Sequence, residues 1–217
     1  MKLSSCLDLD NKFVMGPPLL IILAVFVYGL VHSILALPWA KRRARQWFGP
    51  TADRWYRLGY NLFGVISFLP VLALSAFLPD QTLYTIPTPW SYLALAGQAA
   101  AVLMLAVGVM QTGAWSFLGL KQAFASDDQS PPQLVLTGLY RWVRHPLYTA
   151  GLLFIWLIPV MTVNLLALNI GLTIYLIVGA LFEERKLVME FGEAYIQYRQ
   201  VTPMLIPRPP RSSILET

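Results

Sequence analysis

Long apolar runs without charged residues constrain the fold of this 217-residue chain more than any other feature. Three runs, at about residues 14–37, 58–78 and 90–112, each reach the roughly 20 residues that a helix needs to cross a hydrocarbon core about 30 Å thick. Two further runs follow at about 147–161 and 165–182. The pattern predicts an all-α integral membrane protein with five transmembrane helices.

The composition agrees with this class. The chain is 57% hydrophobic and 12% charged, about half the charged share of a typical soluble domain. Its length suits one domain. We expect a three-helix N-terminal part at residues 1–112, a core with the functional motifs at 113–207 and a tail at 208–217. The only cysteine, Cys6, excludes an internal disulfide and argues against a cysteine-based zinc site.

The ends of the apolar runs predict two further features. Asp8 and Asp10 interrupt the basic region that a cleavable signal peptide needs, so we expect the first run to remain as the first helix. Only Thr162–Asn164 separates the last two runs, and Pro159 lies near the end of the fourth. Because no polar loop lies between them, these two helices are predicted to form a tight hairpin that turns at residues 162–164.

The basic residues predict the orientation in the membrane. All of the 16 Lys and Arg residues except Lys2 and Lys12 fall between the first and second runs, between the third and fourth, or after the fifth. With five spans, these segments share one side of the bilayer, and the positive-inside rule places that side in the cytoplasm. The N-terminus is then outside and the C-terminus cytoplasmic.

Several kinds of chemistry are absent from the sequence. It has neither a glycine-rich dinucleotide motif nor a phosphate-binding loop. The two histidines, His32 and His145, lie on different predicted helices without a carboxylate at ligand spacing, so we expect no metal site. The middles of the predicted spans carry almost no charge, which is unusual for a transporter.

Polar residues instead gather at two predicted membrane boundaries. The segment "LYRWVRHPLY" before the fourth helix contains Tyr140, Arg144, His145, Pro146 and Tyr148, and "FEERKLVMEFGEAYIQYR" after the fifth contains Glu183 and Glu184. Because a hairpin brings the outer ends of its helices together, the two segments are predicted to surround one interfacial pocket. Pro146 suits the first turn of a helix.

The second segment is predicted to continue as an amphipathic helix that leaves the membrane. Leu187, Phe191, Tyr195 and Tyr198 recur at helical spacing, and Gly192 would thin the helix where another group approaches. Simpler interpretations remain open. This helix could lie on the bilayer with its glutamates paired to Arg185 and Lys186 in water. The Arg-His-Pro segment could be a basic interfacial anchor.

The motif "RHPLYTAG", followed after an apolar hairpin by "EERKLVMEFGEAYIQYRQVTPMLIP", resembles the isoprenylcysteine carboxyl methyltransferase superfamily. The resemblance is best over residues 134–207, and Ala150 stands where the family has glycine. Three N-terminal segments, "VHSILALPWAKRR", "RWYRLGYNLF" and "QTGAWSFLGLKQAF", are similar to bacterial methanethiol S-methyltransferases and to a related denitrification-associated membrane family.

The resemblance implies S-adenosyl-L-methionine as the cofactor and a role for each boundary residue. His145 and Tyr148 would contact the adenosine part, with Pro146 and Tyr140 beside them. Arg144 would pair with the methionyl carboxylate. Glu183 and Glu184 would hold the ribose or the ammonium group, or screen the sulfonium. Arg144 and Glu184 are the predicted catalytic residues. For Arg144 the reason is that a neighbouring cation lowers the pKa of a thiol.

Two residues are candidates for the substrate side. His32, beside Ser33 at the inner end of the first helix, and Gln111 at the end of the third could contact the methyl acceptor. Ordinary hydrogen bonds between helices are the favoured alternative for both.

The sequence therefore favours a methyltransferase of the bacterial inner membrane that acts on a small thiol such as methanethiol. One alternative changes the acceptor to a prenylcysteine carboxylate or a phospholipid amine. Another is a non-catalytic membrane assembly or transport factor. The expected partners are the lipid bilayer and a small-molecule or lipidic methyl acceptor, and not nucleic acid.

Overall fold

A computed structural model describes residues 16–124 and 133–209. Lys2, Lys12, Cys6, the last residues of the tail and most of the loop at 126–133 lie outside these ranges. In chain order the elements are α1 (Gly16–Ala36), α2 (Pro38–Phe48), α3 (Thr51–Phe77), β1 (Thr82–Thr85), α4 (Trp90–Gln111), α5 (Ala114–Leu118), α6 (Leu120–Phe124), the 3-10 turn η1 (Gly138–Arg141), α7 (Pro146–Trp156), β2 (Val160–Thr162), α8 (Val163–Phe191) and α9 (Glu193–Val201).

Four of these helices are long and apolar enough to cross a membrane: α1, α3, α4 and α8. Their positions agree with four of the predicted runs. The fourth run forms α7, which is apolar but has only 11 residues and covers about 16 Å. The described ranges therefore contain four helices of spanning length and one shorter apolar helix, as expected for a multi-pass membrane protein.

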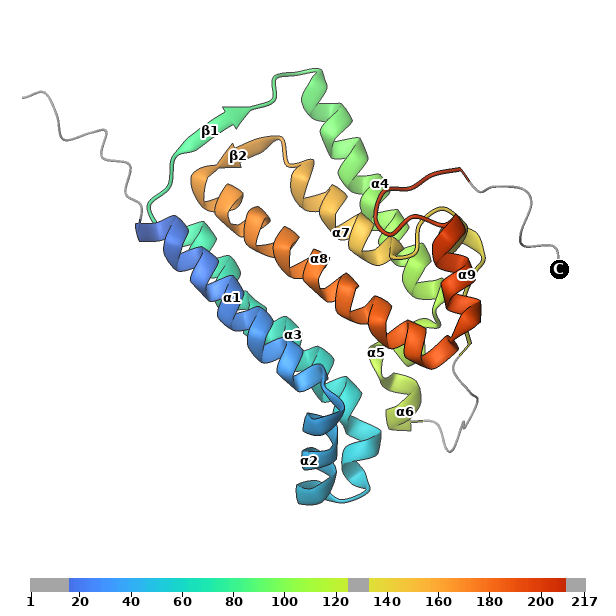
Figure 1. Cartoon of the computed structure of the whole chain (residues 1–217). Coiled ribbons are helices and arrows are strands. Elements are labelled where there is room, and N and C mark those ends of the chain that lie inside the picture. Colours follow the sequence, from blue (N-terminus) through green and yellow to red (C-terminus); the bar gives the residue numbers. More distant parts are fainter. Residues whose placement is uncertain (1–15, 125–132, 210–217) are drawn as a thin grey trace, which may run out of the picture.

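Figure 1 shows how these helices are arranged. α8 contacts α1 and α3 on one side and α7 on the other, while α7 runs along α4. Glycines of α4 allow the close approach of α4 and α7. Leu147 near the start of α7 and Leu157, just after its end, fit against them. A Cβ atom at Gly108 would lie 2.8 Å from Leu147 Cδ2, and one at Gly97 would lie 2.6 Å from Leu157 Cδ1. Such small-residue contacts are typical of helix packing in lipid.

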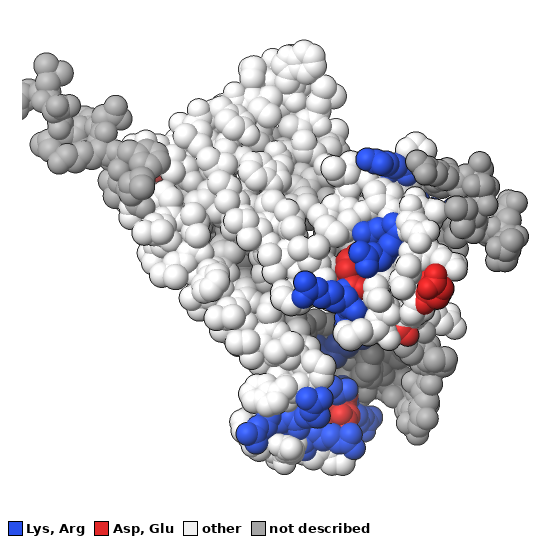
Figure 2. All heavy atoms as spheres, viewed as in Figure 1, with Lys and Arg blue, Asp and Glu red and all other residues white. Residues whose placement is uncertain are grey.

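The packed core lies where α1, α3 and α8 meet. Ile21 and Val25 of α1 are buried against Val71 of α3 and against Ala167 and Leu168 of α8. Many other large apolar side chains point outward, and uncharged atoms cover most of the face in Figure 2. On that face the Lys and Arg side chains gather over α2 and around α9 and the C-terminal segment. The outward apolar surface suits contact with lipid.

The connection between α7 and α8 differs from the predicted turn. α7 ends at Trp156, and a turn and bend at residues 157–159 lead into β2, which pairs antiparallel with β1. The predicted turn residues instead begin α8, where the Thr162 hydroxyl accepts a hydrogen bond from Leu165 N. Pro159 lacks an N–H group and disfavours helix in the residue before it, while its carbonyl oxygen accepts from Ile86 N at 2.8 Å. The all-α prediction missed this small sheet.

Asn164 ties the start of α8 to the end of α3. Its side chain is 1% exposed, and its Nδ2 donates to the carbonyl oxygens of Leu78 and Pro79. Its backbone N–H donates to the Asp80 carboxylate at 3.0 Å. The Asn164 side chain thus supplies hydrogen bonds to two backbone carbonyl groups where the chain leaves α3.

We expect Asn164→Ala to lower the free energy of unfolding by about 1–3 kcal/mol, because the carbonyl groups of Leu78 and Pro79 lose the donor that the buried Asn164 side chain provides. Thermal and denaturant unfolding in detergent micelles would measure the change. Thr82→Ala, in the exposed strand β1, is the matched control and should remain close to the parent protein. Equal stabilities for the two variants would contradict the assigned role of Asn164.

Candidate functional site

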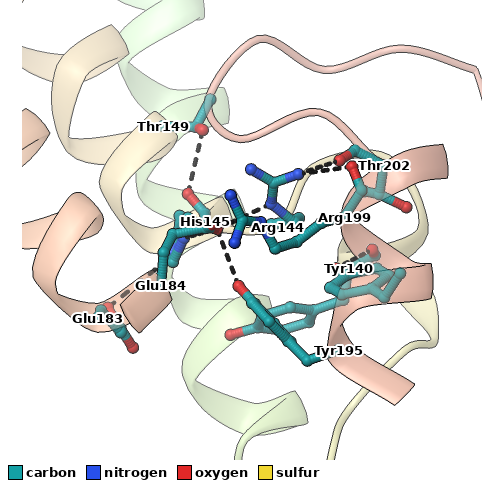
Figure 3. A network of polar contacts seen from close by, with 10 residues as sticks. Tyr140, Arg144, His145, Thr149, Glu183, Glu184, Tyr195, Arg199 and Thr202 are labelled. Carbon is teal, nitrogen blue, oxygen red and sulfur yellow. Dashed lines mark hydrogen bonds and ion pairs between the residues drawn. The ribbon is translucent and has the colours of Figure 1, made fainter. Parts of the chain in front are cut away.

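The two predicted boundary segments lie against each other in the structure (Figure 3). Arg144 and His145 immediately precede α7, and Glu183 and Glu184 lie near the end of α8. Arg144 Nε and His145 Nε2 each lie 2.8 Å from Glu184 Oε1. Residues about 40 positions apart in sequence, by the numbering, therefore share one network.

The C-terminal segment holds the start of α7 in place. Arg144 N and His145 N donate to the carbonyl oxygens of Pro203 and Met204, at 2.9 and 3.2 Å. The Thr149 hydroxyl lies 2.8 Å from the Leu205 carbonyl oxygen. Pro146 is the first residue of α7 and is buried, as predicted, at a position where its missing N–H breaks no helical hydrogen bond. The backbone around His145 is therefore fixed from two sides.

Glu184 is the centre of the network. Its side chain is 5% exposed, and Oε1 also accepts from the Tyr195 hydroxyl at 2.8 Å. Arg199 Nε lies 3.0 Å from Oε2. A buried carboxylate loses several kcal/mol of solvation unless it is paired. Together with Arg144 and His145, these groups compensate the Glu184 charge within the protein.

Arg144 joins three elements. Besides Glu184, its Nη1 donates to the carbonyl oxygens of Arg199 at 2.9 Å and Thr202 at 2.7 Å. These carbonyls belong to the end of α9, where helix carbonyl groups lack helical partners. Arg144 therefore fastens α9 to the start of α7.

Glu183 differs from its neighbour in exposure. Its side chain is 44% exposed, and Oε2 lies 3.7 Å from His145 Nδ1. The Tyr148 side chain lies close to that of Glu183, and the Tyr148 ring centroid lies 5.5 Å from that of His145. The His145 imidazole thus lies between a buried carboxylate and an exposed one. Of the two carboxylates, Glu183 is the one whose surface a ligand can contact.

Three tyrosines around the network are neutral hydrogen-bonding groups at physiological pH. Burial, and then the charge of Glu183, raise the pKa of Tyr140 to about 12. Burial, followed by the hydrogen bond to Glu184, raises the pKa of Tyr195. Burial also raises the pKa of Tyr198, whose hydroxyl donates to the Tyr140 carbonyl oxygen at 2.6 Å. These hydroxyl groups therefore act as donors rather than bases.

The two candidates for the substrate side occupy other places. Gln111 Oε1 accepts from Leu139 N at 3.1 Å, and Gly138, at φ +60°, leaves room for the Gln111 amide. Gln111 therefore joins α4 to η1. His32 of α1 is hydrogen-bonded to Tyr60 of α3, within a second polar cluster.

Gly192 has a different role from the predicted one. It ends α8 at φ +57°, and α9 begins at the next residue, so the predicted continuous helix is broken. No atom lies within 4 Å of a Cβ built at Gly192, so the glycine provides a turn rather than space for a close contact. The turn allows Tyr195 and Arg199 to reach Glu184.

Tyr195 and Arg199 were not among the predicted site residues. Their i, i+4 spacing places them on one face of α9, which is a signal that the sequence contains. The alternative that Glu184 pairs with Arg185 and Lys186 in water is wrong, since Glu184 is buried and pairs with Arg144, His145 and Arg199. The Arg185 guanidinium lies over the Phe182 ring, 5.6 Å from its centroid.

Two further observations limit what the site can hold. Among the residues with assigned positions, no group of three or more His, Cys, Asp or Glu side chains could bind a metal ion. Ala150, where the family has glycine, is 1% exposed, and a Cβ at the adjacent Gly151 would make ordinary contact with Leu176. Ala150 therefore fills packed space in α7.

Comparison with known proteins places the chain among membrane methyltransferases. The phospholipid methyltransferase family matches residues 95–194, a range that includes Arg144, His145, Glu183 and Glu184 and ends just before Tyr195. A methanethiol S-methyltransferase of Crocosphaera subtropica is 35% identical over 130 residues, which are 55% of this chain and 51% of that protein. Methanethiol S-methyltransferase 2 of Bradyrhizobium diazoefficiens is 32% identical over 93% of this chain and 78% of the relative.

A methanethiol S-methyltransferase of Mycobacterium tuberculosis is 44% identical over 73 residues, or 34% of this chain and 30% of that protein. The chain thus spans about half the length of the Crocosphaera protein and more than three quarters of the second Bradyrhizobium protein. No solved structure matches the chain.

Proposed function

The chain belongs to the isoprenylcysteine carboxyl methyltransferase superfamily, and on that premise we propose that it uses S-adenosylmethionine to methylate a small thiol such as methanethiol. The name shared by the relatives above supports the thiol as acceptor. The likeness to the second Bradyrhizobium protein supports the activity most strongly, because it covers 93% of this chain.

The contrast between Glu183 and Glu184 is the observation that carries this proposal. Glu184 is buried and paired within the protein, whereas Glu183 is exposed beside two aromatic rings. An exposed carboxylate suits the ammonium or ribose hydroxyl groups of S-adenosylmethionine, and the His145 and Tyr148 rings suit its adenine. Tyr140 would supply a neutral hydroxyl group. The residues present therefore fit this cofactor.

The structure also favours a division of roles among the charged residues. Glu184 and Arg144, the two predicted catalytic residues, make the contacts that hold α7, α8 and α9 together. We assign both a positioning role, in which they orient His145 and Glu183. Glu183, His145 and Tyr148 would then make the cofactor contacts.

The chemistry requires little more from the protein than alignment and ionisation. When bound, S-adenosylmethionine supplies a methyl group on a sulfonium centre, which is already an activated electrophile. The protein must orient the acceptor and exclude water. A free thiol has a pKa near 8.5, so the site must also remove its proton at neutral pH.

For the membrane arrangement we propose five crossings within a single domain of the bacterial inner membrane. The fifth crossing would consist of α7 together with residues 157–162, because α7 alone covers only about half of the hydrocarbon core. The cluster of basic side chains over α2 supports a cytoplasmic location for that end. The N-terminus would then be outside and the C-terminus cytoplasmic.

The test is to incubate the purified, detergent-solubilised protein with labelled S-adenosylmethionine. We expect cofactor binding and methyl transfer to methanethiol. A farnesylcysteine analogue and phosphatidylethanolamine are the competing acceptors, and transfer to either one instead would change the substrate class. Folded protein that binds no cofactor would contradict the enzymatic function and favour a non-catalytic membrane factor.

A further inference from the structure

A second polar cluster lies within the bundle, away from the Glu184 network. The Tyr60 hydroxyl of α3 and His32 Nε2 of α1 are 2.5 Å apart, and Tyr28 stacks on His32 with ring centroids 5.5 Å apart. Tyr175 of α8 meets His32 edge-on at 6.5 Å. Gly64 makes room for the imidazole, because a Cβ there would lie 2.8 Å from His32 Cε1. Polar groups on membrane helices are costly and often functional.

An apolar groove leads to this cluster. It has a volume of about 490 Å³ and is lined by residues of α1, α2 and α3, among them Leu35, Phe48, Trp55 and Phe63. Tyr60, which is hydrogen-bonded to His32, also lines the groove, so a molecule in the groove can contact Tyr60. Gly59 leaves the groove open, since no atom lies within 4 Å of a Cβ built there.

The cluster also reaches the candidate cofactor site along α8. Tyr175 of α8 meets His32 edge-on, and Gly179 lies one turn further along the same helix. A Cβ built at Gly179 would make an ordinary contact of 3.9 Å with the Tyr148 hydroxyl, and the Tyr148 ring centroid lies 5.5 Å from that of His145. One face of α8 therefore joins the His32 cluster to the side of the bundle that carries His145 and Tyr148.

We propose that this groove admits the thiol acceptor from the bilayer and that Tyr60, supported by His32, accepts the thiol proton. The inference rests on the proposed function and adds an entry route and a proton acceptor. A small alkyl thiol partitions into lipid, and apolar side chains line the groove. The Tyr60 hydroxyl, which is bonded to His32, supplies the polar contact that an S–H group requires.

The proposed step couples the transfer of the thiol proton to the transfer of one methyl group. The thiol S–H bond breaks as its proton moves to the Tyr60 oxygen and the original Tyr60 proton moves to His32 Nε2. The sulfur electron pair forms a bond to the methyl group supplied by the cofactor. The electron pair of the old carbon–sulfur bond stays on the cofactor sulfur. The products are a methyl thioether, S-adenosylhomocysteine and a protonated His32.

His32 exchanges protons through one ring nitrogen. Its Nδ1 atom is buried and has no hydrogen-bond partner among the described residues. The proton therefore enters and leaves the ring through Nε2, which faces the Tyr60 hydroxyl.

Gly59→Phe tests the entry route, because its side chain would fill the groove without a clash at Cβ. We expect the KM for methanethiol to rise about tenfold or more, while calorimetry shows unchanged affinity for S-adenosylmethionine. Leu62→Phe is the matched control, since Leu62 lies on the same helix, is 58% exposed and does not line the groove. Equal KM values for the two variants would overturn the entry route.

Tyr60→Phe tests the proton acceptor, because it keeps the ring and removes only the hydroxyl group. We expect kcat with methanethiol to fall about 100-fold, with cofactor affinity unchanged. Trifluoroethanethiol, a more acidic thiol that is largely ionised near neutral pH, should recover most of the lost rate. A loss of the same size with both thiols would show a structural role for Tyr60 and overturn its role as proton acceptor.

A labelling experiment tests occupancy of the groove without methyl transfer. In a Cys6→Ser, Gly59→Cys variant, methyl methanethiosulfonate should modify the new thiol, and the thioether product dimethyl sulfide should slow this modification several-fold. Lack of protection would contradict binding in the groove. Wild-type protein that is folded but binds no S-adenosylmethionine would instead overturn the proposed function, and this inference with it.

Discussion

Glu184→Ala should lower the free energy of unfolding by about 3–5 kcal/mol, because it leaves the buried Arg144 guanidinium and the buried His145 ring without their carboxylate. Arg144 is 10% exposed and His145 is 4% exposed, so neither side chain can regain full solvation when Glu184 is removed. Tyr195 would also lose its acceptor. Denaturant unfolding in detergent micelles would measure the stability, and calorimetry would measure the accompanying loss of cofactor binding.

Glu190→Ala provides the control for this prediction. Glu190 lies on the same helix and is exposed, so its removal should change the free energy of unfolding by no more than about 0.5 kcal/mol. Glu184→Gln should lie between the two variants, because the amide preserves the shape and one acceptor oxygen but not the charge. The central role of Glu184 would be refuted if Glu184→Ala and Glu190→Ala were equally stable.

Glu183→Ala should produce the opposite pattern. We expect the affinity for S-adenosylmethionine to fall about 10- to 100-fold, the effect of losing one hydrogen bond to a charged group. The stability should change little, because the Glu183 side chain is 44% exposed and its contact with His145 is long, at 3.7 Å. Isothermal calorimetry and unfolding in the same detergent would separate the two effects.

Two outcomes would contradict the assignment of Glu183 to the cofactor site. Wild-type affinity in both Glu183→Ala and Glu183→Gln would exclude this carboxylate from the site. A loss of stability as large as that of Glu184→Ala would show that Glu183 supports the fold instead. Glu190→Ala again serves as the control, with unchanged affinity and stability expected.

The positions of the long helices could be predicted because their physical cause is local. A run of about 20 apolar residues satisfies its backbone in lipid by forming a helix, whatever the rest of the chain does. The run predicted at about 90–112 is α4 at Trp90–Gln111, and the first run is α1. The proximity of Arg144 to Glu184 also followed from connectivity, because residues 147–182 were expected to double back.

The connection before α8 could not be predicted in the same way. β2 exists because β1 lies beside it, and the pairing joins Thr85 with Val160, which are 75 positions apart by their numbering. A short apolar segment of this kind reads equally well as a helix end or as a strand. Only the tertiary pairing decides between them.

By itself the sequence determined that this is a multi-pass helical membrane protein and that arginine, histidine, tyrosine and two glutamates lie at neighbouring membrane boundaries. It did not distinguish Glu183 from Glu184, which are adjacent and chemically alike. Consecutive residues on a helix point about 100° apart, so packing decides which of them is buried. The turn at Gly192 brings α9 back over α8, which buries Glu184 among its partners and leaves Glu183 exposed.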